Sequence, residues 1–278
     1  MNADKPATAY YFRFSLGQRY LHGLVIITFL GLAATGMPLR FSDTQWAKNI
    51  ANAVGGFGAV LFFHKFCAVL VTAGFLFHIG EVLYRALVKK ERGMFWGPTS
   101  LVPQPQDLID IYRQFRWFFW LGPKPRFGRY TYWEKFDYWA VFWGMAIIGV
   151  SGYMMWFAAF FARFVPGYMF NVALLVHGEE ALLAIWFIFM IHFFNTHLRP
   201  EKFPMDPVIF TGRESGEDLR HERPAEYQRL VEQQALQALE TEPPPRWLKN
   251  FAGIIAVAAV GTGFFLLAVT LIAFFAGF

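Results

Sequence analysis

The stretch NVALLVHGEEALLAIWFIFMIH at residues 171–192 decides the fold class of this chain. Most of its side chains are apolar, and a helix needs about 20 such residues to cross about 30 Å of hydrocarbon. Four further apolar stretches are of comparable length, so the sequence predicts an all-α integral membrane protein. The predicted transmembrane helices cover roughly residues 20–40, 58–86, 135–158, 170–196 and 250–275.

The overall composition agrees with a membrane location. Hydrophobic residues make up 56% of the chain and charged residues 16%, and the mean hydropathy of +0.34 excludes an ordinary soluble enzyme. Cys67 is the only cysteine, which excludes a disulfide scaffold, an iron–sulfur cluster held by this chain and covalently attached c-type haem. The net charge of +5 comes from basic residues spaced between apolar segments, so membrane lipid and not nucleic acid is the expected surrounding.

The distribution of lysine and arginine predicts the orientation in the membrane. Three of these residues precede the first apolar stretch, ten lie from Arg85 to Lys135 and eight from Arg199 to Lys249, whereas the opposite side has four. Basic residues concentrate in cytoplasmic loops. We therefore expect the N-terminus and both long loops in the cytoplasm and the C-terminus outside.

The two long loops differ in character. Residues 92–130 are rich in Pro, Trp and Phe, so we expect this segment to lie along the membrane interface. Residues 199–249 carry mixed charges and several prolines, which predicts a cytoplasmic polar excursion with one short helix near 225–240 that begins at Pro224. This excursion is interpreted either as a docking segment for a partner or as a solvated linker.

An internal repeat links the first two helices to the next two. Arg19 and His22 precede Thr35-Gly36 as Lys135 and Tyr138 precede Ser151-Gly152, with 14 positions from His22 to Gly36 and from Tyr138 to Gly152. The histidines of the second helix likewise match those of the fourth. This pattern predicts a four-helix bundle over residues 1–198 and a fifth transmembrane helix over 250–278 outside it.

Five of the seven histidines lie inside predicted membrane helices, where an imidazole is costly unless it faces the bundle and has a partner. His64 and His78 are 14 residues apart, about 21 Å of helix rise, and His177 and His192 are 15 apart. These intervals predict two pairs of histidines at two different depths in the membrane. His64 meets His177 near the outer face, and near the inner face His192 meets either His78, as the repeat predicts, or His22, which lies at a similar depth.

A non-covalently bound b-type haem needs one imidazole on each side of its iron, contributed by facing helices of a bundle. The paired histidines therefore predict two haem b groups. Small residues must admit the flat macrocycle, and the candidates are Gly31, Gly36, Gly74, Gly144, Gly149 and Gly152. The alternative for each histidine taken alone is a hydrogen-bonded contact between helices.

The arrangement resembles the di-haem cytochrome b subunits of membrane-bound formate dehydrogenase and nickel–iron hydrogenase. The resemblance covers roughly residues 12–198 and rests on Arg19 and His22 before Thr35-Gly36, His64 at the start of the second helix, Tyr130 to Trp139 opening the third, and the two histidines of the fourth. It implies a bacterial inner-membrane protein in which His22 and His192 hold the inner haem and His64 and His177 the outer one.

In this resemblance His78 is a spare histidine, and a third haem that uses His78 or His197 stays open. Two features depart from the family pattern. The ligands of its fourth helix are usually 14 residues apart, whereas His177 and His192 are 15 apart, and the family generally has no histidine at the place of His78.

The resemblance also implies a quinone near the inner haem, either menaquinone or ubiquinone. The family motif at the start of the third helix matches residues 130–135, with Thr131 in place of Asn, Trp133 where Gly is common, and Glu134 before Lys135. Asp137 is expected either to exchange protons with the quinone or to pair with Lys135 or Arg19.

Glu179 and Glu180 lie in the outer half of the fourth helix, where an unpaired carboxylate is expensive. Lys65 is the expected partner. The open interpretations are a structural ion pair, a haem-propionate contact from Lys65 and a proton path. Arg19 and Arg40 either hold propionates or anchor the first helix in the head groups.

These features predict a membrane cytochrome b subunit, not catalytic alone, that moves electrons between a quinone on the inside and a redox partner outside. That partner is expected to be a multihaem cytochrome c or an iron–sulfur subunit. The rivals are a His-lined metal-ion transporter and a structural membrane anchor of a respiratory complex.

Overall fold

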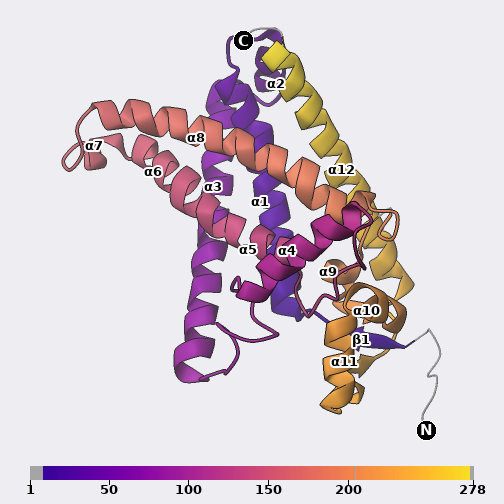
Figure 1. Ribbon diagram of the computed structural model, residues 1–278. Coiled ribbons are helices and arrows are strands. Elements are labelled where there is room, and N and C mark those ends of the chain that lie inside the picture. Colours follow the sequence, from indigo (N-terminus) through magenta and orange to yellow (C-terminus); the bar gives the residue numbers. More distant parts are fainter. Residues whose placement is uncertain (1–8, 204, 276–278) are drawn as a thin grey trace. The chain divides into compact units, whose positions relative to one another are not determined.

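The computed structural model describes residues 9–203 and 205–275. Helices dominate the chain (Figure 1), and five are long and apolar enough to cross a membrane. The prediction of five transmembrane helices is confirmed to that extent, although several begin a few residues earlier than expected. The spans are Leu16–Arg40, Phe57–Val88, Tyr132–Trp156, Tyr168–Leu198 and Arg246–Val269.

Three of the spans contain π-helical segments, in which the backbone bonds reach one residue further than in an α-helix. α1 (Leu16–Arg40) and α12 (Arg246–Phe275) are regular. The second span is α3 (Phe57–Leu83) with η1 (Tyr84–Val88); the third is α5 (Tyr132–Gly144), η2 (Met145–Gly149) and α6 (Val150–Trp156); the fourth is α8 (Tyr168–Phe187), η3 (Ile188–His192) and η4 (Phe194–Leu198). Short helices α2 (Gln45–Ala53) and α7 (Ala158–Phe161) connect spans.

The chain divides into two compact units. The first, here called the helical unit, comprises residues 20–78, 141–206 and the part after 251. The second, the loop unit, comprises the N-terminal residues up to 19 together with 79–140 and 207–250.

The core of the helical unit joins the first, fourth and fifth spans. Ala33 and Met37 of α1 pack with Ile185 of α8 and with Phe189 and Phe193 that follow it. Val260 and Leu267 of α12 cover this cluster, so the fifth span packs against it. α6 and α8 lie side by side within the same unit (Figure 1).

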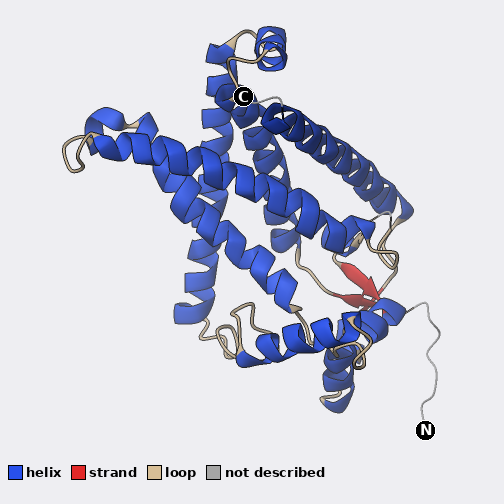
Figure 2. Ribbon diagram, turned by 45° about the horizontal axis from the view of Figure 1, so that its top comes forward, coloured by secondary structure: helices blue, strands red, loops and turns tan. Residues whose placement is uncertain are grey.

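The loop unit contains a small antiparallel sheet that the all-α prediction missed (Figure 2). The strand β1 (Tyr10–Phe12) lies between β2 (Arg213–Ser215) and β3 (Glu240–Thr241), with Tyr10 opposite both Ser215 and Thr241. The sheet forms because the polar excursion returns to the N-terminal segment, two parts of the chain that sequence periodicity does not connect.

The excursion is therefore not a solvated linker. It folds into α9 (Val208–Thr211), α10 (Gly216–Glu222), α11 (Pro224–Glu232) and the short 3-10 turn η5 (Gln237–Leu239). Tyr11 of β1, Leu219 and Leu230 form its buried core. The predicted start at Pro224 is confirmed, but the helix ends at Glu232, well before the expected residue 240.

The other long loop of the loop unit contains α4 (Pro105–Phe118), which the sequence analysis described only as an interfacial segment. Pro105 occupies the first turn of this helix. The side chain of Asp107 accepts a hydrogen bond from the backbone N–H of Gln104 at 2.6 Å and completes a capping box.

Candidate functional site

His64 of α3 and His177 of α8 face each other inside the helical unit. Their ring centroids are 6.2 Å apart and their planes cross at 72°. Both rings are only half-buried by protein. This is the pair that the sequence analysis placed near the outer face.

A hydrogen bond from each ring fixes which nitrogen carries the proton. His177 Nδ1 donates to the carbonyl of Ile148 at 2.9 Å and lies 3.3 Å from the hydroxyl oxygen of Ser151. Because a carbonyl can only accept, the proton is on Nδ1 and the lone pair is on Nε2. Such an outer hydrogen bond orients an imidazole that ligates a metal through its other nitrogen.

The other ring of the pair has the same arrangement. The hydroxyl of Thr35 donates to the carbonyl of Gly31 at 2.6 Å, and its oxygen therefore accepts from His64 Nδ1 at 2.9 Å. His64 is then also protonated on Nδ1 and has a free lone pair on Nε2.

A glycine stands against each ring at the same place in the repeat. A Cβ on Gly36 would lie 3.2 Å from His64 Cε1, and a Cβ on Gly152 would lie 2.9 Å from His177 Cε1. Thr35-Gly36 and Ser151-Gly152 thus make equivalent contacts with His64 and His177. Gly36 and Gly152 were predicted to admit the macrocycle, and both dipeptides were used to align the repeat. The contacts of Thr35 and Ser151 with the histidine rings were not predicted.

The second pair is formed by His22 of α1 and His192 at the end of η3. Their ring centroids are 6.5 Å apart and their planes cross at 42°. The π-helical turn accommodates one additional residue, so the 15-residue interval from His177 to His192 brings both rings to the same side of the helix much as 14 residues would in a regular helix.

The two remaining histidines of the region lie elsewhere. His78 contacts the ring of Phe142, with centroids 6.4 Å apart, and His197 is buried against Phe193 at 5.0 Å. The structure therefore brings His192 together with His22, which is the arrangement that the family resemblance implied and not the one that the repeat predicted.

Both pairs have the spacing that a bis-imidazole metal centre requires. Two metal–nitrogen bonds of about 2.0 Å each, and about 1.1 Å from each nitrogen to its ring centre, separate such rings by about 6 Å. The measured separations of 6.2 and 6.5 Å fit this value. A haem carries most of the ligands of its own iron, so His64 with His177 and His22 with His192 could each hold one such group. Within residues 9–203 and 205–275 no group of three or more His, Cys, Asp or Glu could hold a metal ion.

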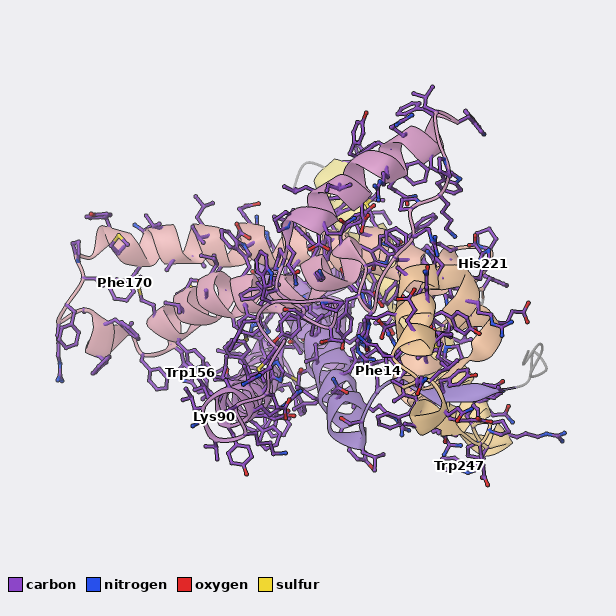
Figure 3. The ribbon with its side chains drawn as sticks, turned by 60° about the horizontal axis from the view of Figure 1, so that its bottom comes forward. Phe14, Lys90, Trp156, Phe170, His221 and Trp247 are labelled. Carbon is purple, nitrogen blue, oxygen red and sulfur yellow. The ribbon has the colours of Figure 1, made fainter. Side chains whose placement is uncertain are left out.

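The charged residues near the outer pair differ from the sequence-based expectation. Glu179 pairs with Arg40 at 2.5 Å, and Glu180 accepts a hydrogen bond from Trp143 Nε1 at 3.1 Å. Lys65 instead places its ammonium 4.9 Å from the ring centre of Trp156. Figure 3 labels Trp156 among the side chains of the structure. Lys65 is therefore not the partner of the two carboxylates, because a cation over an aromatic face is stabilised without a carboxylate.

Thr131 and Glu134, which were predicted to contact a quinone, form the N-terminal cap of α5. The backbone N–H of Thr131 donates to Glu134 Oε2 at 2.7 Å, and the backbone N–H of Glu134 donates to Thr131 Oγ1 at 3.3 Å.

Glu134 also belongs to a cluster of charged side chains. Its Oε1 lies 2.8 Å from Arg223 Nη2 and 3.8 Å from Arg13 Nη2. Glu214 contacts both arginines. Burial, followed by the neighbouring Arg223, lowers the pKa of Arg13 to about 10.

The two basic residues that were predicted to pair with Asp137 have other partners. Lys135 Nζ lies 2.8 Å from Asp107 Oδ1, and Arg19 Nε donates to the carbonyl of Phe210 at 2.7 Å. The contacts that the structure gives to Lys135 and Arg19 are thus Asp107 and the Phe210 carbonyl. Asp137 itself is half-buried in α5, near the start of the third span.

Neither a protein-family model nor a curated protein matches the chain. The resemblance to di-haem cytochrome b subunits stays a prediction that rests on the residues quoted for it.

Proposed function

We propose that this chain is a membrane-embedded cytochrome b subunit that holds two haem b groups in a four-helix bundle. The observation that carries the proposal is the recurrence of one geometry: two histidine pairs, each from two different helices, with ring centroids 6.2 and 6.5 Å apart. In the outer pair the Nδ1 atoms are engaged by hydrogen bonds, which directs both Nε2 lone pairs to a ligand.

The depth of the two pairs suits electron transfer across the membrane. His177 and His192 are 15 residues apart along one span, about 22 Å of helix rise, which covers most of about 30 Å of hydrocarbon. Haem supplies one-electron chemistry. The helices of this chain would fix the two groups at opposite depths, and the apolar side chains around them exclude water.

We further propose that the electrons pass between a quinone pool on the cytoplasmic side and a redox partner outside, such as a multihaem cytochrome c or an iron–sulfur subunit. Thr131 and Glu134 are committed to the cap of α5, so Asp137 is the carboxylate that we assign to proton exchange with the quinone. A carboxylate within a membrane span calls for such a role.

Quinol-dependent reduction of the full-length protein in lipid vesicles tests this function. We expect a quinol to produce the reduced haem absorption, and Asp137→Asn to slow its appearance about a hundredfold, as expected for loss of a group that transfers a proton. Both haem spectra should be unchanged after dithionite. The control is Asp43→Asn, an exposed carboxylate in the loop after α1. Wild-type protein that dithionite reduces but quinol does not would contradict quinol as the electron donor.

A further inference from the structure

Helix α4 has its polar side buried and its apolar side exposed. Asp107, Asp110 and Gln114 are buried. Leu108 and Tyr112, at neighbouring positions around the helix, are 70% and 62% exposed. A helix in water would bury the opposite face, so this orientation is typical of a helix that lies in the membrane interface.

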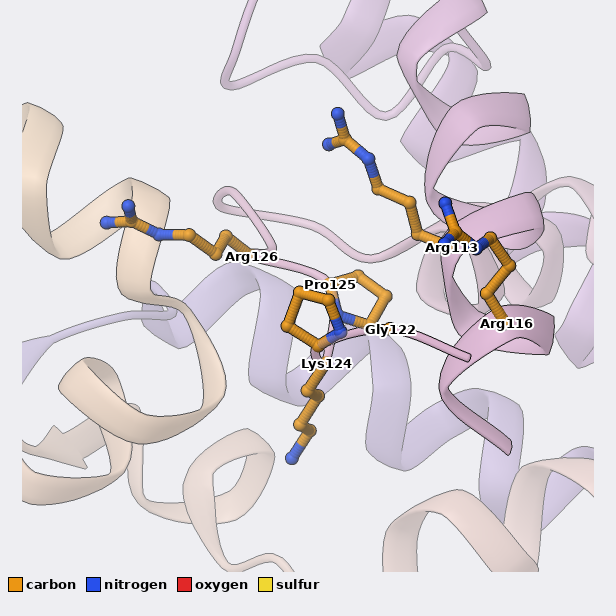
Figure 4. A pocket seen from close by; sticks show the side chains of 7 residues that line it. Arg113, Arg116, Gly122, Lys124, Pro125 and Arg126 are labelled. Carbon is orange, nitrogen blue, oxygen red and sulfur yellow. The ribbon is translucent and has the colours of Figure 1, made fainter. Parts of the chain in front are cut away.

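A hollow of about 350 Å³ lies beside the end of this helix. Figure 4 shows its basic residues: Arg113 and Arg116 extend from α4, and Lys124 and Arg126 come from the loop that follows. The part of the loop that lines the hollow, residues 122–126, contains Pro123 and Pro125, which restrict its backbone and present the basic side chains in a defined arrangement.

The basic residues of this hollow have few carboxylates to neutralise them. Residues 111–133 contain five Lys or Arg and no Asp or Glu. Arg116 donates to the carbonyl of Leu121 at 2.7 Å, Arg126 donates to the side-chain oxygen of Gln228 at 2.8 Å, and Lys124 lies 6.0 Å from the ring centre of Trp117. Arg113 approaches Asp110 only to 3.9 Å. The neutral partners orient the side chains and leave their positive charge available to an anion.

The hollow also adjoins aromatic residues of the kind that mark a membrane interface. Phe118, Phe119 and Trp120 are exposed, Trp120 to 92%. Only five residues separate Arg126 from Tyr132, where the third span begins. This short connection keeps the basic residues near the head groups.

We propose that this basic hollow binds the phosphate of an anionic phospholipid, while the exposed apolar side of α4 lies among the acyl chains. Guanidinium groups pair with phosphate oxygens through two parallel hydrogen bonds, and Arg113, Arg116 and Arg126 supply three of them. Negative lipid in the cytoplasmic leaflet attracts basic residues next to a span. The proposal does not depend on haem binding.

Native mass spectrometry of the full-length protein in neutral detergent tests the site, with phosphatidylglycerol and phosphatidylcholine of identical acyl chains as probes. Wild-type protein should retain phosphatidylglycerol in preference to phosphatidylcholine. Each basic residue near an anionic lipid strengthens binding about fivefold, so Arg116→Gln, Lys124→Gln and Arg126→Gln together should weaken retention about a hundredfold.

The matched control carries Lys48→Gln, Arg163→Gln and Arg220→Gln, three exposed cations that lie outside the hollow. It should retain the lipid as the wild type does. Equal loss in the control, or equal retention of both lipids by wild type, would overturn the proposal. Displacement of the lipid by inorganic phosphate at equal concentration would show that the hollow takes soluble phosphate and would also overturn it. Circular dichroism checks that both triple variants are folded.

Discussion

Substitution of either outer histidine, as in His64→Ala or His177→Ala, is expected to lower the haem content from two to one per chain. The reason is geometric. The outer ring pair and the inner ring pair share no histidine, so removal of one imidazole would take a ligand from only one of the two proposed haems. The remaining haem keeps its absorption band. A pyridine haemochrome assay, divided by protein concentration, gives the count.

The matched control for these variants is His221→Ala. His221 lies in α10 of the loop unit and its side chain is 63% exposed, so both haems should remain. Helical content by circular dichroism separates loss of haem from loss of fold. Retention of two haems in both His64→Ala and His177→Ala would contradict the outer pair.

The second large effect distinguishes the two candidates for the inner ligand. His22→Ala is expected to lose the inner haem, whereas His78→Ala should keep both, because His22 lies 6.5 Å from His192 while His78 packs against Phe142. The measurement is again the haem count per chain, with the reduced spectrum identifying which band is lost.

His192→Ala is expected to lose the proposed inner haem under either arrangement and serves as the reference for that spectrum. Loss of haem in His78→Ala with full content in His22→Ala would show that the sequence repeat, and not the contact of His22 with His192, gives the ligands.

Hydropathy was sufficient to predict the five spans, since each is a continuous apolar stretch longer than a membrane requires. The local conformation of the fourth span was harder to predict from the sequence. A regular helix rotates by about 100° per residue, so the extra residue between His177 and His192 looked like a departure from the family pattern. The π-helical turn that accommodates it follows from hydrogen bonding and leaves no mark in the sequence period.

The loop unit was the hardest part to predict because its contacts connect distant segments. β1 pairs with strands some 200 residues later, and each strand has two or three residues, too few for a period of two to be visible. Helix α4 was missed because its apolar side faces away from the protein, so the exposed aromatic residues suggested an interfacial loop instead of a helix.

For the site, sequence reasoning named all four histidines that the structure brings into pairs but failed for the charged residues around them. Histidines in a membrane span are rare and stand out. Lys65 and Glu134 each had several available partners, and the sequence could not show that Trp156 would take the first and that Arg13 and Arg223 would take the second. Which partner a charged side chain contacts depends on how the helices and loops pack against one another.

The central claim is that the two histidine pairs hold haem. The most direct measurement is the absorption spectrum of the purified full-length protein from haem-replete cells, before and after reduction with dithionite, together with a pyridine haemochrome count. We predict a b-type reduced spectrum and two haems per chain. A colourless preparation of folded protein, which the metal-ion transporter and the structural anchor both predict, would contradict the account.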